Sequence, residues 1–249
     1  MEWVKEFYDK QFEMMVSQGM SEPGKYHEET LKKVEKLAGR EFNSILELGA
    51  GGGEFAATAA KEGYSVTAVE LVPSRIENAK RLKEQMGIND RLTIIEGSFY
   101  EVELNQQFDL VCYLDGFGIG EDEDQLKLLQ RMSSWLKPEG IILMDVYMPW
   151  YWSKSAGQEM EIGKALRRYD FDFQKKRMLD TWFEAGKSSP SVTQSLKCYA
   201  PDELEKLLAS TDLKIDDIVP GGAVDYETLE YHENVEIEEA MSYMVKLIK

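Results

Sequence analysis

Ile45-Leu-Glu-Leu-Gly-Ala-Gly-Gly-Gly-Glu-Phe55 is the stretch that decides the fold. Its apolar first residues predict a buried strand, Gly49, Gly51 and Gly53 predict a turn, and the alanine-rich residues 55–60 predict a helix. Glycine adopts positive φ at little steric cost and lets a ligand approach the backbone closely. The free N–H groups at the start of a helix favour electron-rich ligand atoms. The stretch therefore predicts a nucleotide-binding turn, and the alternative is a tight strand–helix connection without a ligand.

The spacing of the glycines separates two kinds of nucleotide site. The dinucleotide fingerprint G-x-G-x-x-G, counted from Gly49, requires a glycine where this chain has Glu54, and a carboxylate there would repel a pyrophosphate. The pattern from Glu47 to Gly53 is instead E-x-G-x-G-x-G, which resembles the first motif of the class I S-adenosylmethionine (SAM)-dependent methyltransferases. In that family the acidic residue, here Glu47, helps to hold the methionine end of the cofactor, and the glycines pass beneath it.

Two later positions extend the resemblance. A predicted strand at 66–69 runs into Glu70, about 20 residues past the first glycine, where a carboxylate can accept hydrogen bonds from two ribose hydroxyls. The alternative for Glu70 is a solvated loop carboxylate. A third predicted strand, 92–95, leads to Gly97-Ser98-Phe99. Family members carry an acidic residue where this chain has Ser98, so the Ser98 hydroxyl or the Phe99 N–H is expected to contact adenine instead.

A fourth predicted strand, Phe108 to Leu114, precedes a glycine-bearing loop that begins at Asp115 and resembles the family's fourth motif. This loop lies at the carboxyl end of a strand, where open α/β sheets bind their ligands. Asp115 is expected to receive the ammonium group of the cofactor or to orient a substrate amine, and the alternative is an Asx turn that holds its own loop.

Alternation of strands and helices up to the strand at 141–147 predicts right-handed βαβ units and a parallel sheet. Lys137-Pro-Glu-Gly140, expected to be a turn, is a recurrent methyltransferase phrase before that strand. The resemblance implies an α/β fold: a Rossmann-like, seven-stranded, mostly parallel sheet with helices on both faces and an antiparallel last strand.

The expected organisation is one methyltransferase domain over residues 1–249. Residues 1–40 are expected to form a helical segment over the cofactor site, with a Tyr8-Asp9 pair that the family often shows there. Residues 149–200, rich in aromatic and alternating runs, are expected to form an inserted lid of two or three antiparallel strands. The alternative for its aromatic side chains is that they form the core of the insertion itself.

Composition limits the partners. The chain has 46 acidic and 29 basic residues and a net charge of −17, which repels phosphate backbones and argues against nucleic acid as a substrate. Solubility is the simplest reading of that charge. No run of about 18 apolar residues and no signal-peptide pattern appear, which predicts a cytoplasmic protein without a membrane anchor. Two cysteines and two histidines far apart in sequence predict free thiols and no metal site.

The resemblance implies transfer of the methyl group of SAM to a nitrogen or oxygen of a small molecule. The implied cofactor-binding residues are Tyr8, Glu47, Gly49, Ala50, Gly51, Gly53, Glu70, Leu71, Gly97, Ser98, Phe99, Leu114, Asp115 and Phe117. The implied substrate-binding residues are Tyr147, Trp150, Tyr151 and Trp152. Because proximity and orientation supply much of the rate, a general base is optional; the candidates are Asp115, Tyr113 and His27. A non-catalytic SAM- or small-molecule-binding regulatory module is the alternative, and the acceptor and oligomeric state stay open.

Overall fold

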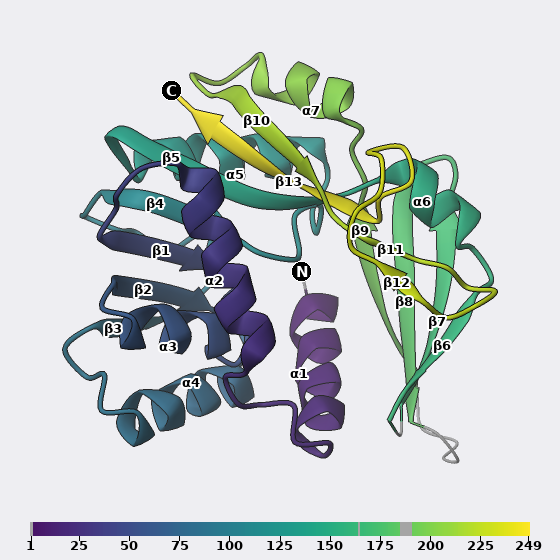
Figure 1. Ribbon diagram of the computed structural model, residues 1–249, viewed down its shortest axis with the longest axis horizontal. Coiled ribbons are helices and arrows are strands. Elements are labelled where there is room, and N and C mark those ends of the chain that lie inside the picture. Colours follow the sequence, from purple (N-terminus) through teal and green to yellow (C-terminus); the bar gives the residue numbers. More distant parts are fainter. Residues whose placement is uncertain (1, 164, 185–190) are drawn as a thin grey trace.

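A seven-stranded sheet with the order β10-β13-β5-β4-β1-β2-β3 forms the centre of the structure, a computed structural model that describes residues 2–163, 165–184 and 191–249 (Figure 1). Its strands are β1 (Ser44–Leu48), β2 (Ser65–Glu70), β3 (Leu92–Glu96), β4 (Phe108–Tyr113), β5 (Leu136–Tyr147), β10 (Lys214–Pro220) and β13 (Ser242–Ile248). The pairs β10–β13 and β13–β5 are antiparallel and the other pairs are parallel. The predicted sheet with an antiparallel last strand is confirmed.

Helices cover both faces of this sheet, also as predicted. They are α2 (Lys25–Ala38), α3 (Glu54–Lys61) and α4 (Pro73–Gln85) on one face, and α5 (Asp122–Ser134) and α7 (Pro201–Leu208) on the other. Successive strand residues point to opposite faces, so neighbours on β1 join different cores. Ile45 packs in the cluster that contains Val34 of α2, whereas Leu46 packs in the cluster that contains Leu128 of α5.

The region inserted after β5 is a second sheet of four antiparallel strands in the order β6-β7-β8-β9. Its elements are α6 (Pro149–Lys154), β6 (Glu159–Ile162), β7 (Ala165–Asp172), β8 (Arg177–Glu184) and β9 (Val192–Lys197). The expectation of two or three strands was too low, because β6 reads Glu-Met-Glu-Ile and has little intrinsic strand preference. Residues 159–162 form a strand because they pair with β7. A two-stranded ribbon, β11 (Ala223–Val224) and β12 (Tyr231–His232), follows β10.

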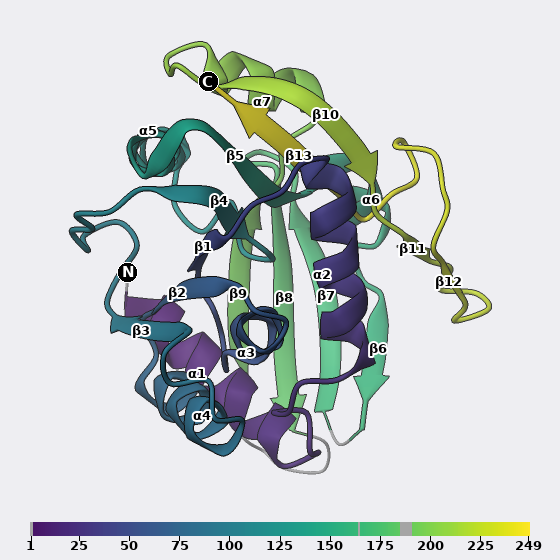
Figure 2. The same cartoon turned by 60° about the vertical axis from the view of Figure 1, so that its left-hand side comes forward.

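Helix α1 (Glu2–Val16) joins the two sheets. In Figure 1 it stands between the α/β layers and the second sheet, and Figure 2 shows it next to α4. Its Asp9 carboxylate accepts a hydrogen bond from Ser74 of α4 at 2.5 Å. Its Tyr8 hydroxyl accepts one from Gln194 Nε2 of β9 at 2.6 Å. The N-terminal segment is therefore tied to the nucleotide-binding half and to the inserted half at once.

The prediction that Lys137–Gly140 is a turn before the fifth strand is wrong, because β5 already starts at Leu136 and includes these residues. The pairing with β4 steps from Phe108↔Leu136 to Leu110↔Ile141. Residues 137–140 thus lie opposite Asp109 alone and form an irregularity inside the strand, which suits a proline and a glycine. No helix in the described part of the chain is both long and apolar enough to cross a bilayer.

Candidate functional site

The glycine turn between β1 and α3 has the predicted unusual backbone. Gly49, Gly51 and Gly53 have φ values of 62°, 58° and 85°, a region that side chains rarely adopt. At Gly53 a Cβ atom would lie 2.6 Å from the Cβ of Ala79 on α4. Gly53 is therefore required by the packing of α3 against α4, whereas Gly49 and Gly51 leave the turn open to a ligand.

Glu70, at the end of β2, ties two ligand-facing turns together. Its side chain is buried, and its carboxylate accepts hydrogen bonds from the backbone N–H groups of Gly51 at 2.7 Å, Leu71 at 2.7 Å and Val72 at 2.8 Å. An ionised carboxylate has about four acceptor positions, so roughly one remains for a ligand hydroxyl. The alternative of a solvated loop carboxylate is wrong, because Glu70 fixes the shape of the glycine turn.

Glu47 on β1 is the unsatisfied group of the site. It is 4% exposed, and its Oε2 atom has no hydrogen-bond partner among the described residues. Burial, followed by the charges of Glu54 and Glu70, raises the pKa of Glu47 well above its usual range. A buried carboxylate without a partner is costly, so this atom is suited to a donor or a cation supplied by a ligand.

These groups line one cavity of about 580 Å³ at the carboxyl ends of the parallel strands. Its walls come from α1, α2, the turns after β1 to β4, the end of β5 and the second sheet. The volume lies within the range of small-molecule sites, and the position is the one that open α/β sheets use for ligands.

The turn after β3 closes one end of the cavity with aromatic surface. Phe99 and Tyr113 pack with ring centroids 5.2 Å apart, and both line the cavity. The Ser98 hydroxyl accepts a hydrogen bond from the backbone N–H of Tyr100 at 3.2 Å. Ser98 therefore stabilises its own turn, and the flat apolar surface beside it suits a nucleobase.

Comparison with known proteins agrees with this geometry. A family model described as a methyltransferase domain matches residues 45–140. A ubiquinone biosynthesis O-methyltransferase of Rickettsia typhi (strain ATCC VR-144 / Wilmington) is 28% identical over 178 residues, which are 70% of this chain and 61% of that protein. The match spans less than two thirds of the length of this relative. The same holds for a ubiquinone biosynthesis O-methyltransferase of Rickettsia canadensis (strain McKiel), of which it covers 41%.

Two solved structures share the fold over nearly the whole chain. The CcbJ methyltransferase of Streptomyces caelestis superposes with a TM-score of 0.73 at 17% identity and covers 90% of both chains. A S-adenosylmethionine-dependent methyltransferase of Clostridium acetobutylicum ATCC 824 gives a TM-score of 0.72 at 16% identity, over 96% of this chain and 98% of that one. Residues 45–140 are therefore similar to a methyltransferase domain, and the whole chain shares the fold of these two methyltransferase structures.

Most of the residues expected at the site line the cavity. They are Tyr8, His27, Glu47, Gly49, Ala50, Gly51, Glu70, Leu71, Ser98, Phe99, Tyr113, Leu114, Asp115 and Tyr147. Gly53, Gly97 and Phe117 do not line it. A Cβ at Gly97 would lie 2.5 Å from Val102, and Phe117 is fully buried against Tyr199, so both serve packing near the site.

The three aromatic residues expected to wall the substrate pocket lie elsewhere. Trp150, Tyr151 and Trp152 fall on α6 and are absent from the cavity lining. Trp150 is 43% exposed, the Tyr151 hydroxyl donates to the carbonyl of Val224, and the Trp152 indole donates to the carbonyl of Met241. A helix spreads consecutive side chains around its axis, so this run fastens the insertion to residues 221–241 instead of facing the cavity.

The three candidates for a general base differ in their surroundings. The Tyr113 hydroxyl donates to the carbonyl of Gly116 at 2.8 Å, and burial raises its pKa well above the usual range, so it is poorly suited to be a base. His27 accepts a hydrogen bond from the N–H of Gly24 on Nδ1 at the start of α2, and burial lowers its pKa. Asp115 adopts a φ of 66° and accepts a 2.5 Å hydrogen bond from the Tyr147 hydroxyl.

Asp145 is a cavity residue that the sequence prediction missed. It lies in the apolar run of β5 and is half-buried at the cavity wall. Burial, reinforced by Asp115 and opposed by Lys33, raises the pKa of Asp145 to about 7. The available signal was a carboxylate inside an otherwise apolar strand, since charged residues are rarely buried without a purpose.

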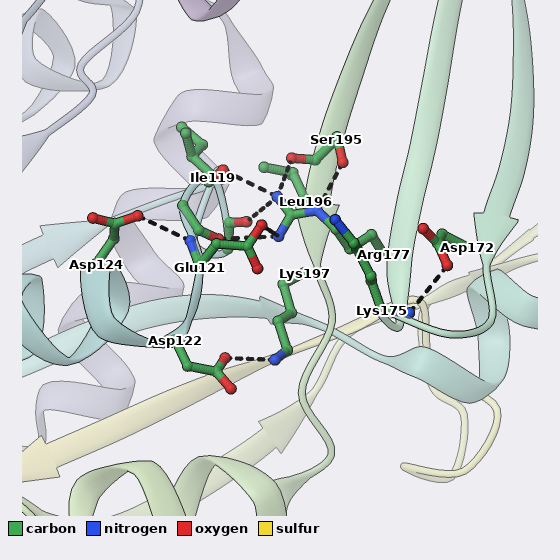
Figure 3. A network of polar contacts seen from close by, with 12 residues as sticks. Ile119, Glu121, Asp122, Asp124, Asp172, Lys175, Arg177, Ser195, Leu196 and Lys197 are labelled. Carbon is green, nitrogen blue, oxygen red and sulfur yellow. Dashed lines mark hydrogen bonds and ion pairs between the residues drawn. The ribbon is translucent and has the colours of Figure 1, made fainter. Parts of the chain in front are cut away.

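Arg177 on β8 connects the second sheet to the loop that follows Asp115. Its guanidinium donates to the carbonyls of Gly118, Ile119 and Gly120 at 3.0 Å each, and to the carbonyl and hydroxyl of Ser195 at 2.8 Å each (Figure 3). The side chain is nearly fully buried. One planar group therefore holds three successive carbonyls of a glycine-bearing loop against the inserted strands.

Proposed function

We propose that this chain binds SAM in the cavity and transfers its methyl group to a nitrogen or oxygen of a small-molecule acceptor. The observation that carries the proposal is the Oε2 atom of Glu47, which has no hydrogen-bond partner among the described residues and lies in the same cavity as Gly49 and Gly51. SAM has an ammonium group that such a carboxylate would pair with, and ribose hydroxyls for the free acceptor position of Glu70. Phe99 and Tyr113 offer their surface to the adenine.

SAM, when bound, supplies a methyl group that its positively charged sulfur already activates. The work left to the protein is to place the acceptor in line, exclude water and manage the acceptor's proton. Helix α1 and the second sheet contribute Tyr8, Arg167 and Trp182 to the cavity, which suits the covering role proposed for these segments. Polar groups at the end of β5, Asp145 and Tyr147, favour an enzyme over a regulatory module that only binds SAM.

The partner implied is a small molecule, because the cavity is enclosed by the second sheet and the net charge of −17 disfavours polyanions. We also place the chain in the cytoplasm, where its two buried free cysteines, Cys112 and Cys198, stay reduced.

Binding of S-adenosylhomocysteine (SAH) tests the proposal. At a hundredfold excess over its dissociation constant, SAH is expected to add about 2.7 kcal/mol to stability and to raise the unfolding midpoint by roughly 5–10 °C, with NAD as the negative control. Absence of an SAH effect, or an effect of NAD alone, would refute the site.

Glu47→Gln gives the residue-specific test. Loss of the carboxylate is expected to weaken SAH binding about tenfold, because a charged hydrogen bond to the ammonium group is replaced by a neutral one. Glu123→Gln on α5, exposed and outside the cavity, makes the same change in net charge and is the control. Equal SAH affinities of the two variants by calorimetry would remove Glu47 from the ammonium site.

A further inference from the structure

Two carboxylates, those of Asp115 and Asp145, line the cavity where β4 and β5 end. Asp115 follows β4, and Asp145 lies one residue beyond the last β4–β5 pair, Tyr113↔Met144. Tyr147, two residues after Asp145, shares its face of β5 and donates to Asp115. All three line the cavity. We refer to Asp115, Asp145 and Tyr147 as the acceptor cluster.

The charge of this cluster is not offset by an ion pair. Within residues 2–163, 165–184 and 191–249, neither Asp115 nor Asp145 has a salt-bridge partner. The cation that the second sheet contributes to the wall, Arg167, is already neutralised. It forms a pair with Asp180 at 2.6 and 3.2 Å, and Asp180 is fully buried and also accepts from the Trp182 indole at 2.9 Å.

A third acceptor faces the same cavity from β9. Gln194 is 4% exposed and lines the cavity. Its Nε2 donates to the Tyr8 hydroxyl, and its carbonyl oxygen has no partner in the described part of the chain. Among the described residues, the buried side-chain atoms without a partner are Glu47 Oε2 and the Tyr243 hydroxyl, so the Gln194 oxygen is accessible in the cavity, where it can accept from an N–H or O–H donor. This acceptor comes from another sheet than the two carboxylates and is compatible with a donor-rich ligand.

We propose that the methyl acceptor is an amine, bound as its ammonium ion by Asp115, Asp145 and the Gln194 carbonyl, with Asp145 receiving the proton that the nitrogen loses. An ammonium group has N–H donors and no acceptor, which matches an acceptor-rich wall. The aromatic rings of Tyr26 and Tyr147 add surfaces that attract a cation. The inference rests on the proposed function and chooses nitrogen over oxygen.

The proton and charge balance follow from the chemistry of an amine. The ammonium form has no lone pair, so it first gives one proton to Asp145. The nitrogen lone pair then forms a bond to the methyl carbon as the bond from that carbon to sulfur breaks, which leaves a neutral thioether and a methylated ammonium. The carboxyl proton of Asp145 passes to water. A half-buried acid whose pKa lies near neutrality exchanges protons in this range.

Direct binding with SAH present tests the inference without relying on turnover. The probes are three pairs, benzylamine and benzyl alcohol, 2-phenylethylamine and 2-phenylethanol, and cyclohexylamine and cyclohexanol, with catechol as a phenolic probe. At least one amine is expected to bind about tenfold more tightly than its alcohol by calorimetry at pH 7.5. No amine preference in any pair, or tighter binding of catechol than of every amine, would overturn the inference.

Variants assign the preference to the cluster. Asp145→Asn is expected to reduce the amine preference about tenfold while SAH affinity stays within twofold of the wild type, and Asp115→Asn is expected to reduce the amine preference to a similar extent. Asp90→Asn, an exposed change of the same charge outside the cavity, is expected to keep the preference. If the preference survives in both cluster variants, the assignment is wrong. If wild-type SAH binding itself is absent, the proposed function fails, which is a separate result.

Discussion

At the level of single residues, two cavity carboxylates on neighbouring strands differ in how many hydrogen-bond partners the protein provides. Glu47 is 4% exposed and its Oε2 atom has no hydrogen-bond partner among the described residues, whereas the Glu70 carboxylate accepts from three backbone N–H groups. The positions of both carboxylates follow from local sequence, because only a few residues separate each one from the turn that it approaches. The first is available for a ligand cation, and the second shapes the turn on which that ligand would lie.

Asp145→Asn is expected to stabilise the protein at high pH. The pKa of Asp145 rises from 3.8 to about 7 on folding, so between these values the folded chain binds a proton that the unfolded chain has released. Stability therefore falls as pH rises through this window and the loss is complete above pH 7. After allowance for solvent screening the gain at pH 8 is about 1–2 kcal/mol, or roughly 2–8 °C in the midpoint.

The comparison of midpoints by calorimetry at pH 4 and pH 8 checks this sign. Little difference between Asp145→Asn and wild type is expected at pH 4, close to the unfolded pKa of 3.8, because only a small part of the pH-dependent loss has developed there. Asp115, which also favours the protonated form, and Lys33, which opposes it, stay unchanged in the experiment. A variant less stable than wild type at pH 8 would show that Asp145 is stabilised by contacts of its charged form.

The positions that the sequence alone could locate are those with local geometry, and their role in binding SAM stays a prediction. The spacing of Glu47, Gly51 and Glu70 placed all three at the cavity. Asp145 could not be found in this way, because its surroundings depend on β4 and α2, which are distant in sequence. Trp150 was placed wrongly because the direction of its side chain depends on whether the chain leaves β5 as a strand or as the helix α6.

At the level of elements, Arg177 of the inserted sheet holds the loop that follows Asp115 by hydrogen bonds to its backbone carbonyls. The loop contains Gly116, Gly118 and Gly120, two of which have positive φ. Such a loop has little intrinsic order, and Arg177 holds three of its successive carbonyls, beside a hydrogen bond from Tyr113 to Gly116 and one from Gly118 to Gln125. The position of Asp115 at the cavity therefore depends on a side chain about 60 residues away in sequence.

Arg177→Met is expected to destabilise the protein and to loosen this loop. Loss of donors for buried carbonyls costs about 3 kcal/mol, or roughly 6–12 °C in the midpoint. Hydrogen exchange at Gly118 and Ile119 should accelerate, and Arg177→Lys should recover part of the protection because lysine retains N–H donors. Arg168→Met, which removes an exposed pair with Glu159 on the same sheet, is the control and should change stability by about 1 kcal/mol or less.

Unchanged hydrogen exchange in the loop of Arg177→Met would contradict the coupling between Arg177 and the loop.

The pattern of elements in the sequence could not predict this contact. Hydrophobic periodicity located the strands of the main sheet, yet it says nothing about which carbonyls a buried arginine selects. It also undercounted the inserted sheet, since β6 is a strand only because β7 pairs with it.

At the level of the whole molecule, the excess of acidic residues opposes compactness. A net charge of −17 spread over the surface produces repulsion that is relieved when the chain expands. Exposed ion pairs such as Lys206–Asp202 add little against it. The sign and size of the net charge are read from the sequence alone, whereas its cost depends on how far folding brings the charges together.

Added salt is therefore expected to stabilise the protein at pH 8. Raising sodium chloride from about 0.02 M to 0.3 M shortens the screening length and should raise the midpoint by roughly 2–4 °C, equivalent to about 1 kcal/mol. At pH 5, close to the isoelectric point of about 4.6, the same change should have almost no effect. A midpoint that falls with salt at pH 8 would indicate that attractive ion pairs outweigh the repulsion.

The location of β13 has a consequence for how the chain is made. Among the strands of the main sheet it comes last in sequence, yet it lies between β10 and β5, with Tyr243, Val245 and Leu247 fully buried. A ribosome delivers the chain from the N-terminus at about 5–20 residues per second, so β5 waits with an unpaired edge until residues 242–248 emerge. During synthesis β5 therefore has unpaired backbone N–H and C=O groups along one edge, which can pair with other chains. Chaperone binding to nascent chains that lack residues 242–248 would reveal this stage.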